Sequence, residues 1–211
     1  MQYIKLSMVI LFVTTAGMEG KPAFALDKPV AQEKYQNFNW KSPNGWEGAV
    51  FDVPTWFAKD MLYTGREVIR FHDGFYDRDS TGFWTYAFAL LVEQTGVPTT
   101  QAITEETKRY FLGLARDLGD KKDVDYSASK IHVKPVSQWT VDKTTKRRSQ
   151  NYRLEIFDSF TTGKPITLNV RVTSWPCSDK YRAIHYALSP HDMTQPIWGE
   201  LDKEVSALTC W

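Results

Sequence analysis

Five polar side chains at alternating positions of three predicted strands have the types and spacing of a ligand-binding surface. They are Arg153, Glu155, Asn169, Arg171 and His185. Arginine donates forked hydrogen bonds to small anionic or polar ligands, and a histidine changes its charge near neutral pH. The pattern therefore predicts a ligand-binding face. It is also typical of the solvated face of an antiparallel sheet, where charged residues pair across strands.

A second possible site would perform hydrolysis or elimination. His72, Asp73 and Glu93 supply the acid and base groups that a small hydrolase or lyase needs. The sequence has no Gly-x-Ser-x-Gly elbow, no His-Glu-x-x-His motif and no phosphate-binding glycine loop. We therefore assign no catalytic residue and expect no cofactor. An enzyme stays open as an alternative because a catalytic triad is assembled in space rather than along the chain.

Two segments contain metal-binding residue types without the spacing of a metal site. The loop from His72 to Ser80 has three carboxylates, which suit calcium, but it does not match an EF-hand and equally fits an ordinary turn. His185 and His191 lie near Asp192, but Pro190 interrupts both strand and helix periods between the two histidines. We assign no metal ligand.

Strand-like alternation dominates the second half of the chain. Short turn-rich connections at 161–165 and 176–180 predict antiparallel hairpins. The predicted strands run over Ser137 to Lys143, Tyr152 to Phe157, Ile166 to Thr173, and Tyr181 to Leu188.

The first half contributes more strands and a helix. Alternation places Glu67, Ile69 and Phe71 on one face of a strand, and apolar residues occupy both faces of Phe83 to Val92, as in a central strand. A shorter strand is predicted at 51–53. Thr104 is a candidate cap for a helix that ends near Leu118.

A terminal helix is predicted from Trp198 to Leu208, because apolar residues recur there at helical spacing. The predicted fold is α+β: an antiparallel sheet of six to seven strands with one mid-chain helix and one C-terminal helix.

The N-terminus has the organisation of a secretory signal peptide. Lys5 precedes an apolar run from Leu6 to Ala16, and Ala23-Phe24-Ala25 is a small-x-small cleavage signal. We expect residues 1–25 to be removed and residues 26–211 to form a single domain, periplasmic or secreted, with no transmembrane segment in the mature chain. The only two cysteines, Cys177 and Cys210, are then expected to form a disulfide.

The charges are nearly balanced, with Lys and Arg totalling 26 and Asp and Glu totalling 25. This balance gives no electrostatic reason to expect nucleic acid as a partner. One basic stretch, Lys143 to Arg148, is interpreted as a solvated loop tip.

Short aromatic motifs carry a family resemblance. Over about residues 46 to 118 the chain resembles a set of uncharacterised secreted bacterial proteins. The resemblance rests on three motifs: Phe51-Asp52-Val53-Pro54, Tyr63-x-Gly65-x-Glu67-x-x-Arg70-Phe71 and Phe83-Trp84-x-Tyr86-x-Phe88. The strand order and closing helix are similar to the PsbP-like fold, whose members are extrinsic or adaptor proteins rather than enzymes. This resemblance implies no functional residues.

Together these patterns predict an exported, non-catalytic domain that binds a small polar ligand or an envelope protein. Two alternatives stay open: a small exported hydrolase or lyase, and a structural component of the cell envelope.

Overall fold

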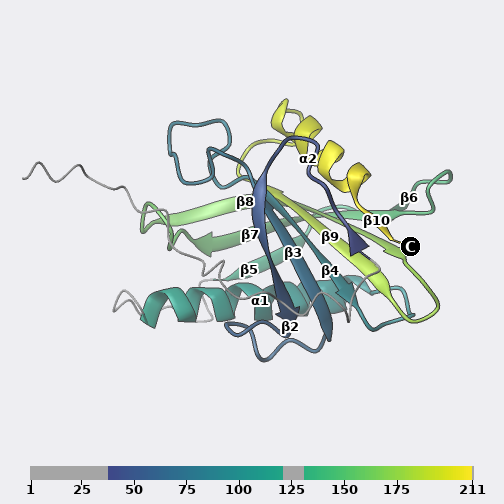
Figure 1. Cartoon of the computed structure of the whole chain (residues 1–211). Coiled ribbons are helices and arrows are strands. Elements are labelled where there is room, and N and C mark those ends of the chain that lie inside the picture. Colours follow the sequence, from purple (N-terminus) through teal and green to yellow (C-terminus); the bar gives the residue numbers. More distant parts are fainter. Residues whose placement is uncertain (1–37, 121–130, 211) are drawn as a thin grey trace, which may run out of the picture.

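The computed structural model describes residues 38–120 and 131–210. The predicted signal peptide, residues 1–25, lies outside this part of the chain. Two helices lie on opposite sides of a large sheet (Figure 1). The elements are β1 (Phe38–Asn39), β2 (Glu47–Val53), β3 (Gly65–Phe71), β4 (Tyr86–Val92), α1 (Thr100–Asp120), β5 (His132–Pro135), β6 (Thr140–Val141), β7 (Arg148–Phe157), β8 (Pro165–Pro176), β9 (Arg182–Ser189), α2 (Ile197–Ala207) and β10 (Thr209–Cys210).

The main sheet consists of two antiparallel meanders joined at its centre. Its strand order is β2-β3-β4-β9-β8-β7-β5, and β6 pairs with β7 at the side of this path. The first meander ends in β4 and the second ends in β9, and these two strands pair antiparallel along their length. β1 and β10 form a separate two-stranded sheet. The α+β class is thus confirmed, although the main sheet has eight strands rather than six to seven.

The larger core lies between the sheet and α1, on the side called here the α1 face. Alternation in β4 and β9 directs Phe88, Leu90 and Tyr186 toward this core, where all three are buried. Phe88 stacks between Tyr110 of α1 and Tyr186 of β9, with ring centroids 4.9 and 4.5 Å away. Stacked rings in van der Waals contact fix the helix against the sheet.

The opposite side of the sheet, called the α2 face, carries small residues at its centre. β4 and β9 contribute four buried alanines there: Ala87, Ala89, Ala183 and Ala187. Bulky side chains from the covering segments, including Trp40, Trp46 and Trp198, pack over them. Small residues allow such rings to approach the sheet closely, so the two faces are filled by different means.

Helix α1 begins five residues earlier than predicted. Thr99, rather than Thr104, caps it: the Thr99 side-chain oxygen accepts a hydrogen bond from the Ala102 N–H. The Thr104 hydroxyl instead donates to the Thr100 carbonyl inside the helix. Glu106 then lies in the second turn, where it is buried and accepts a hydrogen bond from the Leu62 N–H. Neither helix in the described part of the chain has the length and apolarity needed to cross a bilayer.

Of the predicted strand at 137–143, only Thr140–Val141 forms a strand, β6, because side chains interrupt the ladder before it. Ser137 accepts the Asn151 N–H with its hydroxyl and the Gln150 side-chain amide with its carbonyl. Trp139 turns back to donate to Thr100 on α1. Along the edge of β7 that faces away from β8, the short strands β5 and β6 pair with it on either side of this interruption.

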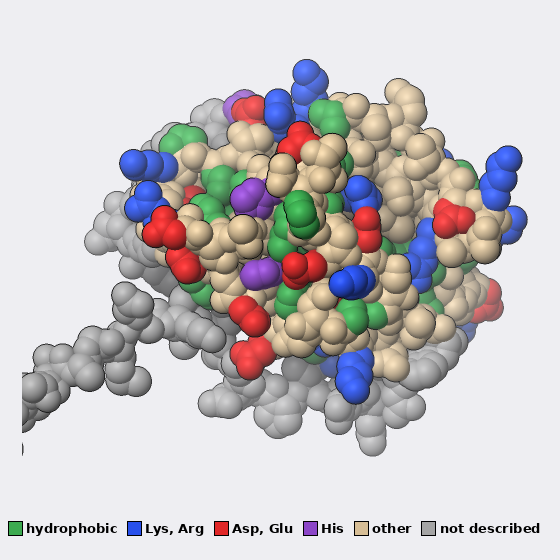
Figure 2. All heavy atoms as spheres, turned by 90° about the horizontal axis from the view of Figure 1, so that it is seen from above, with side chains coloured by type: hydrophobic (Ala, Val, Ile, Leu, Met, Phe, Trp, Pro, Cys, Tyr) green, Lys and Arg blue, Asp and Glu red, His purple; other side chains and the backbone are tan. Residues whose placement is uncertain are grey.

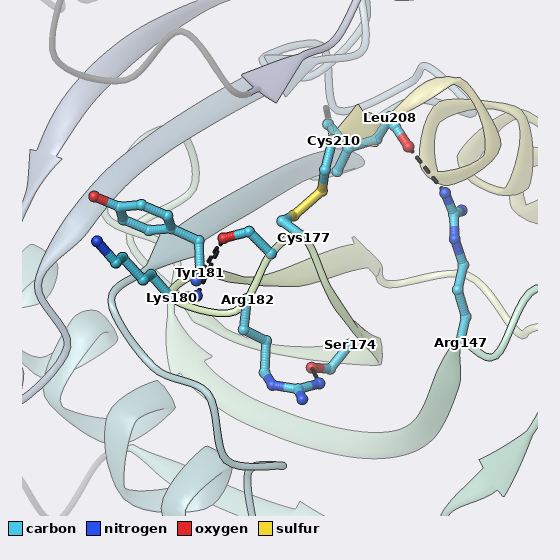
Figure 3. The surroundings of a disulfide bond; sticks show 9 residues. Arg147, Ser174, Cys177, Lys180, Tyr181, Arg182, Leu208 and Cys210 are labelled. Carbon is cyan, nitrogen blue, oxygen red and sulfur yellow. Dashed lines mark hydrogen bonds between the residues drawn. A yellow bond between two sulfur atoms is a disulfide. The ribbon is translucent and has the colours of Figure 1, made fainter.

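The predicted disulfide between Cys177 and Cys210 is confirmed. It ties the end of β8 to β10, beyond α2 (Figure 3). Nearby, the Arg147 guanidinium donates to the carbonyls of Val205 and Leu208, at 2.6 and 2.9 Å, and lies 4.1 Å from the centre of the Trp175 ring. A cation that satisfies the last carbonyls of a helix stabilises its end. Arg147 is therefore not part of a solvated loop tip.

Candidate functional site

The strand register places the five predicted ligand-binding residues on the same side of the sheet. Arg153 pairs with Asn169 across β7 and β8, while Arg171 lies two residues further along β8. Thr173, the next residue on that face, pairs with His185 on β9. All five side chains therefore belong to the α2 face, although they differ strongly in exposure.

Arg153 and Glu155 are exposed at the β7 end of this face. The neighbouring strand places Lys134 opposite Arg153 and His132 opposite Glu155. This exposed set of two basic residues, an acid and a histidine is the part of the predicted surface that solvent reaches. Viewed from the side of α2, the molecule shows acidic and basic side chains interspersed, with hydrophobic side chains in separate groups (Figure 2).

Asn169 and Arg171 instead hold the segment that covers the sheet. Asn169 donates its side-chain amide to the His191 carbonyl at 3.0 Å. Arg171 pairs with Asp202 of α2, and its guanidinium lies 5.1 Å from the centre of the Trp198 ring. Both side chains therefore stabilise the docking of the segment that contains α2.

His185 is buried beneath the covering segment, with only 1% of its surface exposed. The Trp40 ring approaches it edge-on, with centroids 5.4 Å apart, and neither imidazole nitrogen has a hydrogen-bond partner. Burial, and then the charges of Arg147 and Arg171, lower the pKa of His185 to about 3. His185 is therefore neutral at pH 7 and out of reach of a ligand at this surface.

A buried carboxylate fastens the covering segment to α2. Glu204 is fully buried and accepts hydrogen bonds from the Trp40 indole N–H at 3.0 Å, the Ser42 hydroxyl at 2.6 Å and the Asn44 side-chain amide at 2.9 Å. A buried carboxylate is tolerated when several donors satisfy it. Glu204 thus joins the segment at residues 40–44 to α2 through hydrogen bonds to a buried carboxylate.

The alternative catalytic residues are not brought together. His72 follows β3 and Glu93 follows β4, and the antiparallel pairing of these strands places the two residues at opposite ends of the ladder. The His72 Nδ1 atom accepts the Gly74 N–H within a local turn. In residues 38–120 and 131–210, no three His, Cys, Asp or Glu side chains are grouped as metal ligands.

The α1 face contains a small hollow among the side chains of the core. The free space at its centre holds about one water molecule. Its lining, which defines the aromatic hollow, consists of Phe51, Phe57, Ile69, Phe71, Phe75, Tyr86, Tyr110, Leu114 and Phe160. Small-molecule sites are typically concave and mostly apolar, with a few polar groups.

Edge-to-face contacts fix the rings of the aromatic hollow. Phe75 lies 4.9 Å from Phe71 and 5.4 Å from Tyr86, with steep angles between their planes. Outside the lining, Trp56 is 48% exposed and contacts Phe51 and Phe57, each with centroids 5.0 Å away. A half-exposed tryptophan thus lies against two of the lining rings.

Glu67 is the polar group beside the aromatic hollow. It is fully buried on β3, and its Oε1 atom accepts the Tyr110 hydroxyl hydrogen at 2.7 Å. Its Oε2 atom has no hydrogen-bond partner. Burial raises the pKa of Glu67 to about 8, although the hydrogen bond from Tyr110 opposes this shift. Glu67 is therefore mostly protonated at pH 7.

Sequence reasoning did not select Glu67 as a site residue. The signal was present, because alternation predicts that Glu67 shares a face with Ile69 and Phe71. A carboxyl group on an otherwise apolar strand face is a buried acid that needs a partner. The hollow itself depends on loop and helix residues whose meeting requires the tertiary fold.

Neither a protein-family model nor a curated protein matches this chain. The geometry of its two faces is therefore the basis for the function proposed below.

Proposed function

We propose that this protein is an exported, non-catalytic binding domain whose small-molecule ligand occupies the aromatic hollow. The observation that supports this proposal is a concave aromatic surface beside a buried acid with one unpartnered oxygen. Apolar walls supply affinity through burial, and a single polar group supplies orientation. The ligand class is thus a small, largely apolar molecule with one polar group.

The exposed residues Arg153, Glu155 and Lys134 support a second candidate, the binding of a small anionic ligand at the α2 face. Lys134 and Arg153 are directly opposite one another, so both cations can reach the same anion. This site is open rather than concave, and Glu155 lies two residues further along β7. The aromatic hollow is therefore the stronger candidate.

Native mass spectrometry of protein purified from the exported fraction tests the proposed function. We expect a bound mass that denaturation releases. Leu114→Trp fills the aromatic hollow from α1 and should abolish the bound mass. Leu118→Trp lies one turn further along α1, outside the lining, and should keep it.

Thermal unfolding of both variants verifies that each is folded. A bound mass that persists in a folded Leu114→Trp variant would contradict the proposed location. An additional Arg153→Ala variant would then show whether the ligand is held at the α2 face instead.

A further inference from the structure

Two arginines at the starts of β7 and β9 have no acidic partner. Arg182 is 5% exposed and Arg148 is half-buried, and the Nε atom of each is buried without a hydrogen-bond partner. In the part of the chain that the structure describes, neither guanidinium forms an ion pair with an Asp or Glu residue. Burial of a charge costs free energy that a counter-ion offsets. An anion from solution would offset this cost.

The two guanidiniums converge on one serine of β8. Alternation places both arginines on the α1 face, and Arg148 lies directly opposite Ser174 in the β7–β8 register. Arg182 approaches from the other side of β8: its Nη1 atom donates to the Ser174 Oγ atom at 3.4 Å, and its side chain points away from the disulfide (Figure 3). Burial, and then the charge of Arg148, lower the pKa of Arg182. The two positive charges are thus close enough to repel each other.

The first turn of α1 lies beside Arg148. The Thr100 hydroxyl donates to the Gln150 Oε1 atom at 2.9 Å, and Gln150 is the next residue after Arg148 on this face of β7. The Trp139 indole N–H donates to Thr100 at 3.1 Å, and its ring centre lies 5.2 Å from the Arg148 guanidinium carbon. This first turn contains no acidic residue. The positive end of the helix dipole, which favours anions, therefore adds to the two arginines.

The arginine pair is open to solvent on the side of Arg148. Arg148 and Trp139 are both half-buried. Arg182 instead donates from Nη2 to the carbonyl of Thr95 at 3.1 Å, in the exposed segment that leads into α1. An ion from solution can therefore reach the pair at Arg148, and Arg182 supplies a second charge that is already shielded from water.

The charges and donors define the class of ligand. A guanidinium presents a planar fork of N–H donors that matches the oxygens of phosphate, sulfate and carboxylate groups. Two guanidiniums and a helix N-terminus favour a doubly charged ion over a singly charged one. A tetrahedral ion also offers oxygens in several directions, as donors from β7, β9 and α1 require.

We propose that Arg148 and Arg182 bind a small tetrahedral oxyanion, of the phosphate or sulfate class, at the N-terminal end of α1. The free ion and the phosphate group of a larger molecule share this chemistry. The inference goes beyond the proposed function and does not depend on it, because neither arginine belongs to the lining of the aromatic hollow.

Isothermal titration calorimetry with sulfate, inorganic phosphate and acetate tests this inference. Sodium chloride keeps the ionic strength equal in all titrations, so that screening does not differ between them. We expect a single sulfate or phosphate ion to bind. Acetate, with one charge, should bind about tenfold more weakly. No measurable binding of sulfate and phosphate, or equal affinity for sulfate and acetate, would overturn the inference.

Methyl phosphate distinguishes the two sources of the oxyanion. Binding as tight as that of inorganic phosphate would show that one oxygen is free to carry a larger molecule. Binding about tenfold weaker would show that all four oxygens are held, as expected for the free ion. The oxyanion site is supported in either case.

Arg148→Gln removes one charge at a half-buried position, so we expect it to fold and to bind sulfate about tenfold more weakly. Arg116→Gln is the matched control, because Arg116 is exposed on α1 far from its N-terminus, and it should bind sulfate as the wild type does. Arg182→Gln removes the buried charge and should also weaken sulfate binding. Thermal unfolding establishes whether each variant folds. If Arg182→Gln does not, Arg148→Gln still decides the inference.

Unchanged sulfate affinity in a folded Arg148→Gln variant would overturn the inference. A loss of sulfate binding in Arg153→Gln, with Arg148→Gln unaffected, would also overturn it and would assign the anion to the α2 face. Amide chemical shifts on addition of sulfate locate the ion independently. We expect them to change at residues 95–101 and around Arg148, and changes confined to other parts of the chain would contradict the proposed site.

Discussion

The two faces of the sheet are built from opposite choices of side chain and are covered in different ways. On the α1 face, large rings such as Phe88 and Tyr186 fill the core, yet a hollow and an unpaired carboxyl oxygen remain. On the α2 face, alanines admit a cover that Glu204, Arg147 and the disulfide hold in place, with both ring nitrogens of His185 unpaired beneath it. The comparison indicates that the α2 face serves closure, whereas the α1 face is the better place for a ligand.

Glu67 on the α1 face and His185 on the α2 face are both fully buried, and the two groups respond to pH in opposite directions. Glu67 is protonated at pH 7 because burial raises its pKa to about 8. His185 is neutral because burial lowers its pKa to about 3. Each group avoids charge in the interior, as expected where desolvation dominates.

Removal of the disulfide should have the largest effect. The cysteines are 33 residues apart, so the double variant Cys177→Ser/Cys210→Ser should lose about 4 kcal/mol of unfolding free energy by the chain-entropy relation. Urea unfolding with and without reductant measures this loss. Reductant should destabilise the wild type and leave the double variant unchanged. Equal stability of oxidised and reduced wild type would show that closure of the α2 face does not need the covalent bond.

Glu67 should make the protein less stable as pH rises. Between about pH 4.5 and pH 8 the unfolded chain loses the proton that the folded protein keeps. The folded state then binds more protons, so the unfolding free energy falls by about 1.4 kcal/mol per pH unit. The total loss is about 3 kcal/mol by pH 7. The difference between wild-type and Glu67→Gln urea unfolding curves across this range isolates the effect, and a flat difference would contradict a buried neutral acid.

His185 should act in the opposite sense. Between about pH 6.5 and pH 3 the His185 imidazole is protonated in the unfolded chain but stays neutral in the folded protein. The unfolding free energy therefore falls as pH falls. The expected slope is again about 1.4 kcal/mol per pH unit, over the part of this range where the protein stays folded. His185→Leu should remove this slope in the same urea experiment. If His185→Leu loses unfolding free energy at low pH as steeply as the wild type does, titratable groups other than His185 cause the acid sensitivity.

The Glu204 network should have a smaller but specific effect. Glu204→Ala leaves the Trp40 indole and the Ser42 hydroxyl without an acceptor, which should cost about 2 kcal/mol. Glu200→Ala, one turn earlier on α2, is the control because Glu200 is 40% exposed and lies 3.8 Å from His72. Its cost should be below about 0.5 kcal/mol. Similar losses of unfolding free energy in the two variants would show that the Glu204 hydrogen bonds do not hold the cover on the α2 face.

Local patterns predicted the elements whose packing follows their own sequence. Alternation correctly separated the apolar face of β8 from Asn169 and Arg171, because a strand has only two faces. The start of α1 was wrong because two hydroxyl residues compete as caps, and Thr99 rather than Thr104 has the required position. The interruption after β5 was missed because Ser137 breaks the ladder with bonds to the neighbouring strand.

Whether each predicted ligand-binding residue is exposed or buried depends on which segment covers the sheet. Alternation placed Arg153 and His185 on one face but could not show that Trp40, from the N-terminal side, lies over His185. The aromatic hollow was out of reach for the same reason, since Phe51, Leu114 and Phe160 meet only in the folded chain. The spacing of residues thus predicted which side chains share a face of the sheet. Which segments cover each face, and where a hollow remains, could be seen only in the tertiary structure.

Amide chemical-shift mapping by NMR, which compares the wild type with its bound mass against the same protein after removal of that mass, tests most directly that the α1 face is the ligand site. We predict shifts that cluster around the aromatic hollow, at Phe51, Ile69 and Tyr110, and that are absent in Leu114→Trp. Shifts centred on Arg153 and its neighbours on the α2 face, or no localised shifts, would contradict it.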